Sequence, residues 1–222
     1  VGNPLPLSGD GLVFGASTRL TPNNDLAGLS IAGISFSNGA GAYTLSGLGI
    51  TLTRDIRNNS AVRQTITMPL TVGADQFWDG GSAGLAINGG FTLGSHALTL
   101  DHGVTVAAST PVFLTGSLTM RRGSTLLAGG VQLDGTVALG DAGTQFTSRQ
   151  TLYVGTSSAG GITAGSGASL DSAGVVIGYF TGSSGQLSLA DTGTAWRDSG
   201  NVIIGLGGSA SLALTRGAQA TL

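Results

Sequence analysis

The chain has 222 residues, of which 41% are hydrophobic, and this is enough to bury a large core. It contains no Lys, Glu or Cys, its formal net charge is −2, and only 9% of its residues are charged. These values exclude a nucleic-acid-binding protein with a basic stripe, a highly charged disordered chain, a disulfide framework and a thiolate metal site.

The first part of the chain reads as loop followed by short strands. Residues up to about 24 contain three Pro and a single strand-like segment, 12–14. Further segments with strand-like alternation follow at 29–31, 34–36, 43–45, 50–52 and 66–68. Gly-rich and Ser-rich turns separate them. Because two strong helix formers, Lys and Glu, are missing and the chain holds 40 Gly, we expect very little helix.

Beyond residue 65 an apolar-x-apolar triplet returns at a narrow period. The triplets begin at Leu70, Phe91, Val112, Val131, Leu152, Val175 and Val202. A second series of triplets lies between them, at 85–87, 98–100, 118–120, 137–139, 162–164, 187–189 and 212–214. Two to three short strands per period of about 20 residues, without a helix, predict a parallel β-solenoid. Its coils number about ten, each of roughly 19–27 residues.

The clearest internal repeat relates residues 143–155 to residues 193–205. Phe146 and Trp196 fall at equivalent positions in the two copies, and the copies end at Gly155 and Gly205. A residue that recurs with the coil is expected to pack at a corner rather than to bind a ligand. Gly178 ends the intervening strand in the same way. No linker divides the chain, so we predict one elongated domain, 1–222, with less regular coils in 1–65 and regular coils in 66–222.

Several segments resemble a known family. Residues 174–178, 182–189 and 193–205 resemble the repeat of passenger regions in bacterial type V secreted autotransporters. Residues 24–26, 34–36, 40–47 and 58–60 look like the autotransporter-associated β-strand repeat, whereas 101–130 match poorly. The resemblance implies a right-handed parallel β-helix on the bacterial cell surface. It also implies export through a C-terminal outer-membrane barrel that this sequence does not contain, and a role in adhesion, self-association or biofilm formation.

The residues that could carry chemistry give weak patterns. His96 and His102 should lie at opposite ends of one strand, too far apart to share a metal, with Asp101 and His102 in a solvated turn. The G-x-S-x-G match at 80–84 is followed by a strand rather than the helix that a nucleophile elbow needs. The sequence lacks the Lys of a P-loop and the Gly-Asp arrays of calcium-binding repeats. We therefore expect no catalytic, cofactor or metal site.

Two groups of residues remain as candidates for binding. Arg54, Arg57 and Arg63 with Asp55, and the doublet Arg121-Arg122, could contact an acidic polysaccharide, although Arg at turns more simply keeps a low-charge surface soluble. The aromatic residues Trp78, Tyr153, Tyr179, Phe180 and Trp196 could stack on sugars. Tyr179 and Phe180 lie in the longest coil, so we expect them on a protruding loop and take them as candidate surface-binding residues.

The sequence thus predicts a non-enzymatic, extracellular stalk or adhesive fragment of an autotransporter passenger. Its expected partners are a host or cell-surface receptor, a glycan, or copies of itself on neighbouring cells, and not nucleic acid. One alternative is a protein that binds or degrades polysaccharide on the same scaffold. A further alternative is a spacer that drives passenger folding during secretion.

Overall fold

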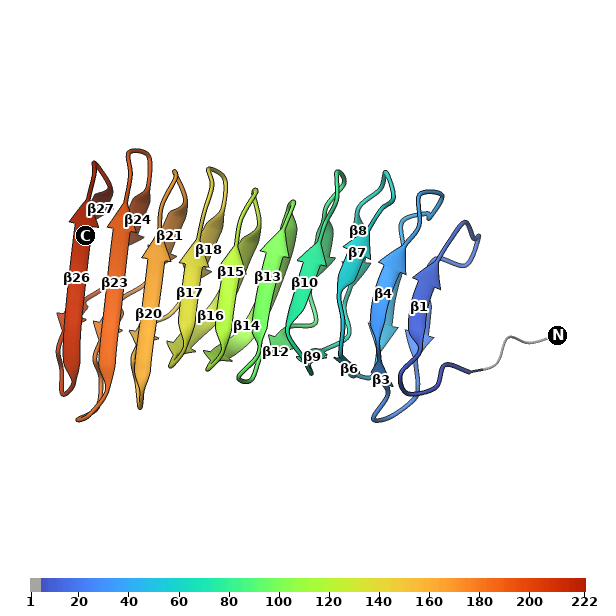
Figure 1. The fold of residues 1–222 in the computed structure, drawn as a ribbon, viewed down its shortest axis with the longest axis horizontal. Helices are drawn as coiled ribbons and strands as arrows, with labels where there is room; N and C mark the ends of the chain where they lie inside the picture. Colours follow the sequence, from blue (N-terminus) through green and yellow to red (C-terminus); the bar gives the residue numbers. More distant parts are fainter. Residues whose placement is uncertain (1–4) are drawn as a thin grey trace.

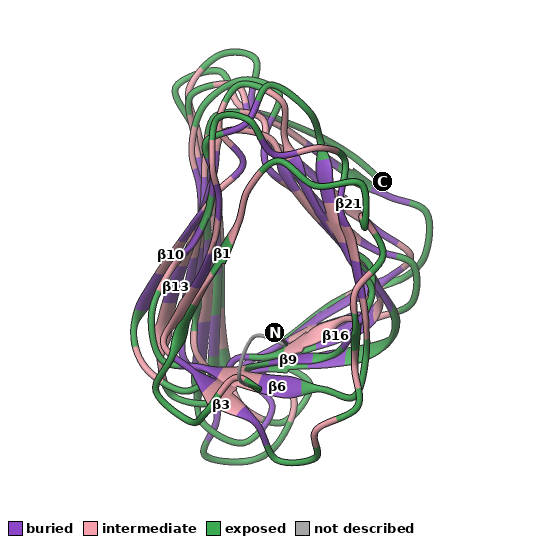
Figure 2. Cartoon of the chain, turned by 90° about the vertical axis from the view of Figure 1, so that its right-hand side faces the viewer, coloured by how far each residue is buried: buried purple, intermediate pink, exposed green. Residues whose placement is uncertain are grey.

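A computed structural model describes residues 5–222, and in this part of the chain strands and turns stack into a β-solenoid of ten turns without a helix (Figure 1). All paired strands run parallel, and in cross-section they enclose a roughly triangular core (Figure 2). The chain therefore has the all-strand solenoid fold that its repeat predicts, because no single coil can bury its own apolar face.

One strand of each turn contributes to a ten-stranded sheet, here called the first face. Its strands are β1 (Gly11–Phe14), β4 (Gly33–Phe36), β7 (Ile56–Asn58), β10 (Gln76–Asp79), β13 (Ala97–Asp101), β15 (Ser117–Met120), β17 (Thr136–Leu139), β20 (Ala159–Ala164), β23 (Ser184–Ala190) and β26 (Ser209–Thr215).

The second face follows in the same way from turn to turn. It comprises β2 (Asn23–Asn24), β5 (Thr44–Gly47), β8 (Gln64–Ile66), β11 (Leu85–Ile87), β14 (Val104–Leu114), β16 (Thr125–Leu133), β18 (Gln145–Ser148), β21 (Ser169–Ser172), β24 (Ala195–Asp198) and β27 (Gln219–Thr221). The pairing of β14 with β16 is irregular between Ala108 and Pro111, and the C-terminal parts of both strands continue onto the third face.

The third face completes each turn. It contains β3 (Ser30–Ile31), β6 (Ile50–Leu52), β9 (Leu70–Val72) and β12 (Phe91–Thr92), then the C-terminal parts of β14 and β16, then β19 (Leu152–Val154), β22 (Val175–Ile177) and β25 (Val202–Ile204). Viewed from the N-terminal end in Figure 2, the chain rises along the first face and descends along the second, moving clockwise away from the viewer. The solenoid is therefore right-handed.

The register places one inward side chain above another on every face. On the second face the column runs Leu45, Ile66, Ile87, Val106, Leu126, Phe146, Leu170 and Trp196. Phe146 and Trp196, fully buried, therefore lie in one column, two turns apart. The expectation that they pack at a corner is wrong, because both lie within second-face strands, β18 and β24, and point into the core. Such columns remove large apolar side chains from water and so supply most of the stability of the fold. Each fully buried side chain contributes roughly 1.5–3 kcal/mol.

The expected change in regularity near residue 65 does not occur in the register. The first turns are equal in length, as shown by the evenly spaced first-face partners Leu12, Ile34, Ile56, Trp78 and Leu100. The next two turns, which end at the partners Met120 and Leu139, are shorter than these first turns. The last three, which end at Ala164, Leu189 and Leu214, are longer. The first turns are therefore at least as uniform in length as the later ones.

Three Gly residues turn the corner from the third face to the first. Gly155, Gly178 and Gly205 have φ values of +73°, +72° and +73°, which L side chains rarely adopt. A Cβ at Gly178 would lie 2.4 Å from the carbonyl oxygen of Ser209 on the next turn, whereas a Cβ at Gly205 would meet nothing nearer than 3.5 Å. The two positions therefore differ in crowding but not in backbone conformation.

This difference gives a test of corner packing. We expect Gly205→Ala to lower the free energy of unfolding by about 1–2 kcal/mol, from the backbone conformation alone. Gly178→Ala should cost more, because its methyl group also collides with the next turn. Urea unfolding of both variants measures the difference, and equal losses would contradict the steric role of Gly178.

Trp196 provides a second test, because its indole both fills the core and joins two turns. Its Nε1–H donates to Ser172 Oγ at 3.0 Å, and the Ser172 hydroxyl donates to the carboxylate of Asp198. Trp196→Ala should lower the free energy of unfolding by about 3–5 kcal/mol. Phe113→Ala is the control, since Phe113 is 60% exposed and should change stability by about 0.5 kcal/mol at most. Similar losses in both variants would refute this role.

Candidate functional site

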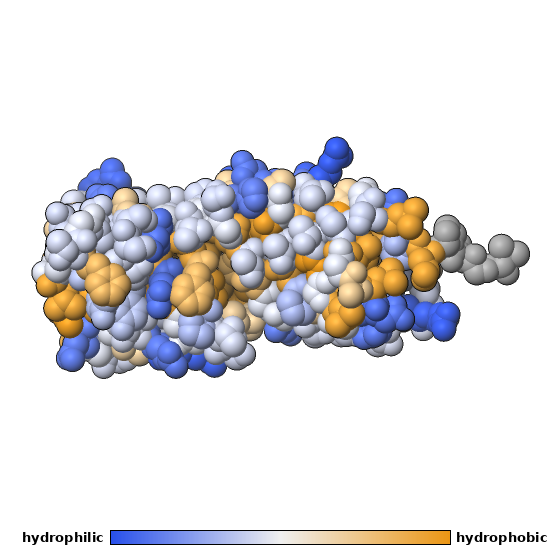
Figure 3. All heavy atoms as spheres, turned by 90° about the horizontal axis from the view of Figure 1, so that it is seen from below, coloured by the Kyte–Doolittle hydropathy of each residue, from blue (hydrophilic) through white to orange (hydrophobic). Residues whose placement is uncertain are grey.

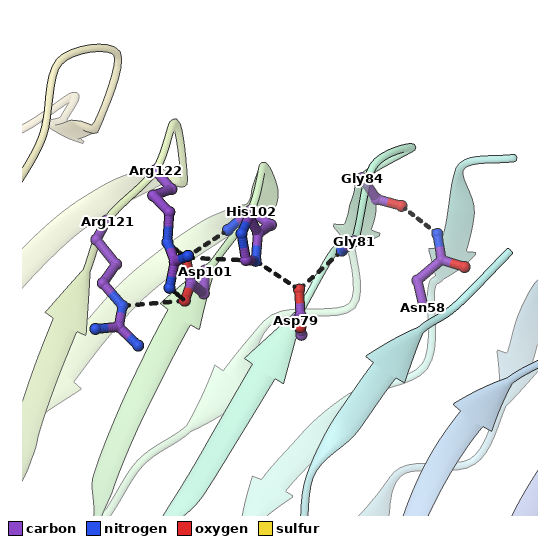
Figure 4. A network of polar contacts seen from close by, with 8 residues as sticks. All are labelled: Asn58, Asp79, Gly81, Gly84, Asp101, His102, Arg121 and Arg122. Atoms are coloured by element: carbon purple, nitrogen blue, oxygen red, sulfur yellow. Dashed lines mark hydrogen bonds and ion pairs between the residues drawn. The ribbon is translucent and has the colours of Figure 1, made fainter. Parts of the chain in front are cut away.

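A cluster of charged side chains lies where the first face turns toward the second (Figure 4). We call it the Asp101 cluster, and its members are Asp79, Asp101, His102, Arg121 and Arg122. Asp79 and Asp101 are register partners at the ends of β10 and β13, and Arg121 follows β15. Three successive turns therefore bring two carboxylates, an imidazole and two guanidinium groups together.

Asp101 is the centre of this cluster and is fully buried. Its carboxylate accepts hydrogen bonds from Arg121 Nε at 3.0 Å, from Arg122 Nε at 2.7 Å and Nη2 at 2.6 Å, and from the His102 backbone N–H at 2.8 Å. Burial would raise the Asp101 pKa, but the hydrogen bonds from Arg122 and His102 and the nearby positive charges outweigh it, so the pKa lies below its usual value.

The expectation that Asp101 lies in a solvated turn is therefore wrong. The sequence could not show that Arg121 and Arg122, one turn later, reach back to cover the carboxylate. The same contact shows that these two Arg do more than keep the surface soluble. His102 has positive φ, +50°, and its Nδ1 lies 3.0 Å from Asp79 Oδ1. Asp79 Oδ1 also accepts the Gly81 N–H at 2.9 Å.

The other polar candidates do not join this cluster as one site. His96 precedes β13 and lies 3.9 Å from Asp75, at the opposite end of the strand from His102. Arg57 pairs with Asp55 at 2.9 Å, while Arg63 donates to Thr105 on the second face. Arg57 and Arg121 both lie over the Phe77 ring, at 5.9 and 5.6 Å from its centroid. The turn at 80–84 leads into β11, which is a strand, as expected.

A second feature is the aromatic groove on the C-terminal part of the third face. Its volume is about 420 Å³, and it is lined by Thr151, Tyr153, Ala173, Gly174, Val176, Tyr179, Gly200, Asn201, Ile203 and Leu206. The rings of Tyr153 and Tyr179 pack edge to face with centroids 5.2 Å apart, and Tyr179 contacts Phe180 in the same way at 4.4 Å. Seen from below in Figure 3, apolar side chains gather along this side of the rod.

The loop at 178–183, which carries Tyr179 and Phe180, is longer than its neighbours. It has six residues between β22 and β23, against four at 155–158 and at 205–208. Tyr179 is half-buried, and its backbone N–H bonds to the Gly155 carbonyl at 2.9 Å, so this residue packs against the previous turn rather than protruding. Phe180 is 58% exposed, in keeping with its expected place on the surface.

Sequence reasoning missed the wider groove, although a signal for it was present. The middle residue of each third-face triplet points outward. In the first turns these residues are Ser30, Thr51, Thr71 and Thr92; in the following turns they are Phe113, Gln132, Tyr153, Val176 and Ile203. Along the third face, the outward side chains therefore change from hydroxyl-bearing residues in the first turns to mainly aromatic and aliphatic residues in the later turns. Only the stacking of successive turns brings Tyr153 close to Asn201, Ile203 and Leu206.

A third feature, the Asp134 carboxylate and its hydrogen-bond donors, joins two turns and carries no obvious chemistry. The Asp134 carboxylate accepts hydrogen bonds from the backbone N–H groups of Thr156 and Ser157 and from both hydroxyls. Burial opposes ionisation, but these donors prevail and lower the pKa of Asp134 to about 2. The carboxylate therefore fixes the turn at 155–158 on the preceding coil.

The fold and these sites define a right-handed parallel β-solenoid with hydrogen-bonded carboxylates that join turns at its corners and with an aromatic groove on its third face. In comparisons with known proteins, no family model, no curated protein and no solved structure matches the chain. Residues 5–222 hold no group of three or more His, Cys, Asp or Glu that could bind a metal. They also include no helix that is long and apolar enough to cross a membrane.

The lowered pKa of Asp134 gives a pH-dependent test. Its pKa is about 2 in the folded chain and 3.8 when unperturbed, so its contribution is complete above the unfolded pKa and is lost as the pH falls from 3.8 toward 2. Asp134→Asn should lower the free energy of unfolding by about 2 kcal/mol at pH 7 and by much less at pH 2.

Urea unfolding at both pH values measures this difference. Asp25→Asn is the control, because the Asp25 side chain is exposed and makes no hydrogen bond within residues 5–222. Its loss should stay within about 0.5 kcal/mol at both pH values. If Asp134→Asn loses the same stability at both pH values, the ionised Asp134 carboxylate does not stabilise the fold in the way that its lowered pKa indicates.

Proposed function

We propose that this chain is a non-enzymatic adhesive rod, part of an extracellular autotransporter passenger, and that copies on neighbouring cells associate through the first face. The single observation that carries this proposal is the chemistry of the first face. From β15 to β26 its five strands contain no charged residue. A surface of this extent without charge offers little repulsion to a second copy of itself.

The outward positions of these strands form regular columns of uncharged residues, most of them polar. One column consists of Thr119, Ala138, Thr163, Ser188 and Ala213. Beside it stand Ser117, Thr136, Gly161, Gln186 and Ser211. Neighbouring strands are spaced by about 4.8 Å, and hydroxyl or amide groups occupy every position of these columns except Ala138, Gly161 and Ala213. Two such surfaces can therefore form many hydrogen bonds in register.

The shape of this surface also favours close approach. Because the outward groups are small, they leave a shallow hollow of about 400 Å³ between Thr136, Gly161, Gln186 and Ser211. Side chains from another copy can enter it without displacing a bulky residue. Each contact is weak, but many rods on one cell surface act together, and this multivalency supplies avidity.

The geometry of the Asp101 cluster supports a non-enzymatic role. A general acid or base needs a proton or lone pair that can reach substrate. Asp101 is fully buried, and its two oxygens accept four hydrogen bonds from protein groups. Ion pairs of this kind hold adjacent turns together, which suits a rod that bears load between cells.

Charge placed on the first face tests the proposal. We expect Thr163→Asp with Gln186→Asp to weaken self-association at least about tenfold, since like charges meet across the contact. Both residues are exposed, so the variant should fold normally. The measurement is sedimentation equilibrium of the purified rod together with clumping of rod-coated beads.

The matched control carries the same added charge on the second face, as Ala107→Asp with Gln219→Asp, both at exposed positions. This variant should clump beads like the parent chain. The proposal fails if the parent rod neither self-associates nor clumps beads, or if the two double variants lose association equally.

A further inference from the structure

We infer that the aromatic groove on the third face is a binding site for a neutral glycan. The groove lies on a different face from the proposed association surface. Tyr153, Tyr179, Ile203 and Leu206 supply apolar walls, while Thr151 and Asn201 supply polar groups. This mixture suits a ligand with both apolar ring faces and hydroxyl groups, as a sugar has.

The aromatic rings are held in place before any ligand arrives. Tyr153 on β19 packs against Tyr179, which in turn packs against Phe180, so each ring restricts the movement of the next. The Tyr179 backbone is bonded to Gly155 of the preceding turn. Rings fixed in this way lose little conformational freedom when a sugar ring stacks on them, which favours affinity.

The polar groups of the groove are available to a ligand. Within residues 5–222, the hydroxyls of Tyr153, Tyr179 and Thr151 and the amide of Asn201 make no hydrogen bond to protein. Aromatic hydroxyls, an aliphatic hydroxyl and an amide together can donate to and accept from sugar hydroxyls.

The charge of the groove selects the class of glycan. Among its lining residues there is no Arg, Asp or His. An acidic sugar would lose the hydration of its carboxylate without gaining a guanidinium partner, and this costs binding energy. A neutral sugar has no such penalty. The same lining disfavours a charged peptide and a nucleic-acid phosphate.

The shape of the groove places the ligand across neighbouring turns. Its walls come from three successive third-face strands, β19, β22 and β25, and from the residues just before and after them. The longer loop at 178–183 supplies Tyr179 to this lining and packs the 58% exposed Phe180 against it. Extra residues of a solenoid turn thus form one side of the site.

The test uses neutral hexasaccharides of glucose, mannose, galactose and N-acetylglucosamine, with hexagalacturonate as the acidic comparison, in isothermal titration calorimetry. We expect the parent chain to bind at least one neutral hexasaccharide more tightly than hexagalacturonate. Tyr153→Ala should weaken that binding about tenfold, the effect of losing one stacked ring. Tyr153→Phe should keep most of it.

Phe113→Ala is the matched control. Phe113 is an exposed aromatic residue of the same outward column but lies outside the groove, so its loss should leave affinity within about twofold. Thermal unfolding of each variant separates lost binding from lost folding. If Tyr153→Ala unfolds, Asn201→Ala and Leu206→Ala report on the same groove from a later turn.

Three results would overturn the inference: no neutral hexasaccharide binds, binding is unchanged by every groove variant, or hexagalacturonate binds best. Bead clumping separates this site from the association surface. Groove variants should clump beads normally, whereas the first-face variant should retain glycan binding. A groove variant that abolishes clumping and binds glycan normally would assign the groove to association between copies instead.

Discussion

The constraint on which this structure depends is the register between successive turns. Each inward side chain must stand on the one before it, as Phe146, Leu170 and Trp196 do, because only a continuous column excludes water. Turns can differ in length as long as the columns stay aligned, and the turn from Met120 to Leu139 is shorter than the turn from Leu139 to Ala164. Insertions therefore go to corners and loops, and 178–183 is such a loop.

The corners of the solenoid meet a second requirement, the pairing of buried polar groups. Asp101, Asp134 and Asp198 each accept several hydrogen bonds, and in each case at least one donor belongs to a neighbouring turn. An unpaired buried carboxylate would cost several kcal/mol, so these residues stabilise the fold only together with their donors. Most of the few charges that this chain carries near its core thus serve to join turns.

The three faces differ because only outward side chains are free of these constraints. The first face of the last turns presents small uncharged groups, whereas the third face changes from Thr71 and Thr92 to Tyr153 and Ile203 along the rod. One scaffold can therefore carry side by side the two surfaces for which we propose association and glycan binding. Tyr179 and Phe180 could be singled out from the sequence because their loop interrupts the repeat. The remaining lining was not found, because most of its members lie on later turns than Tyr153, within the repeat segments 174–178 and 193–205, and a repeat indicates the scaffold rather than a ligand site.

The sequence by itself determined the solenoid, the number of its turns and the columns of its core, since alternation at period two and a repeat of about 20 residues allow few other ways to bury the apolar side chains. It also determined that Phe146 and Trp196 share a column and that Gly155, Gly178 and Gly205 share a corner. Only the tertiary structure decided which residues of different turns meet. Arg121 and Arg122 cover Asp101 because successive turns stack on one another. The same stacking of turns places Tyr153 beside Asn201 and Leu206, and no local sequence pattern relates these residues.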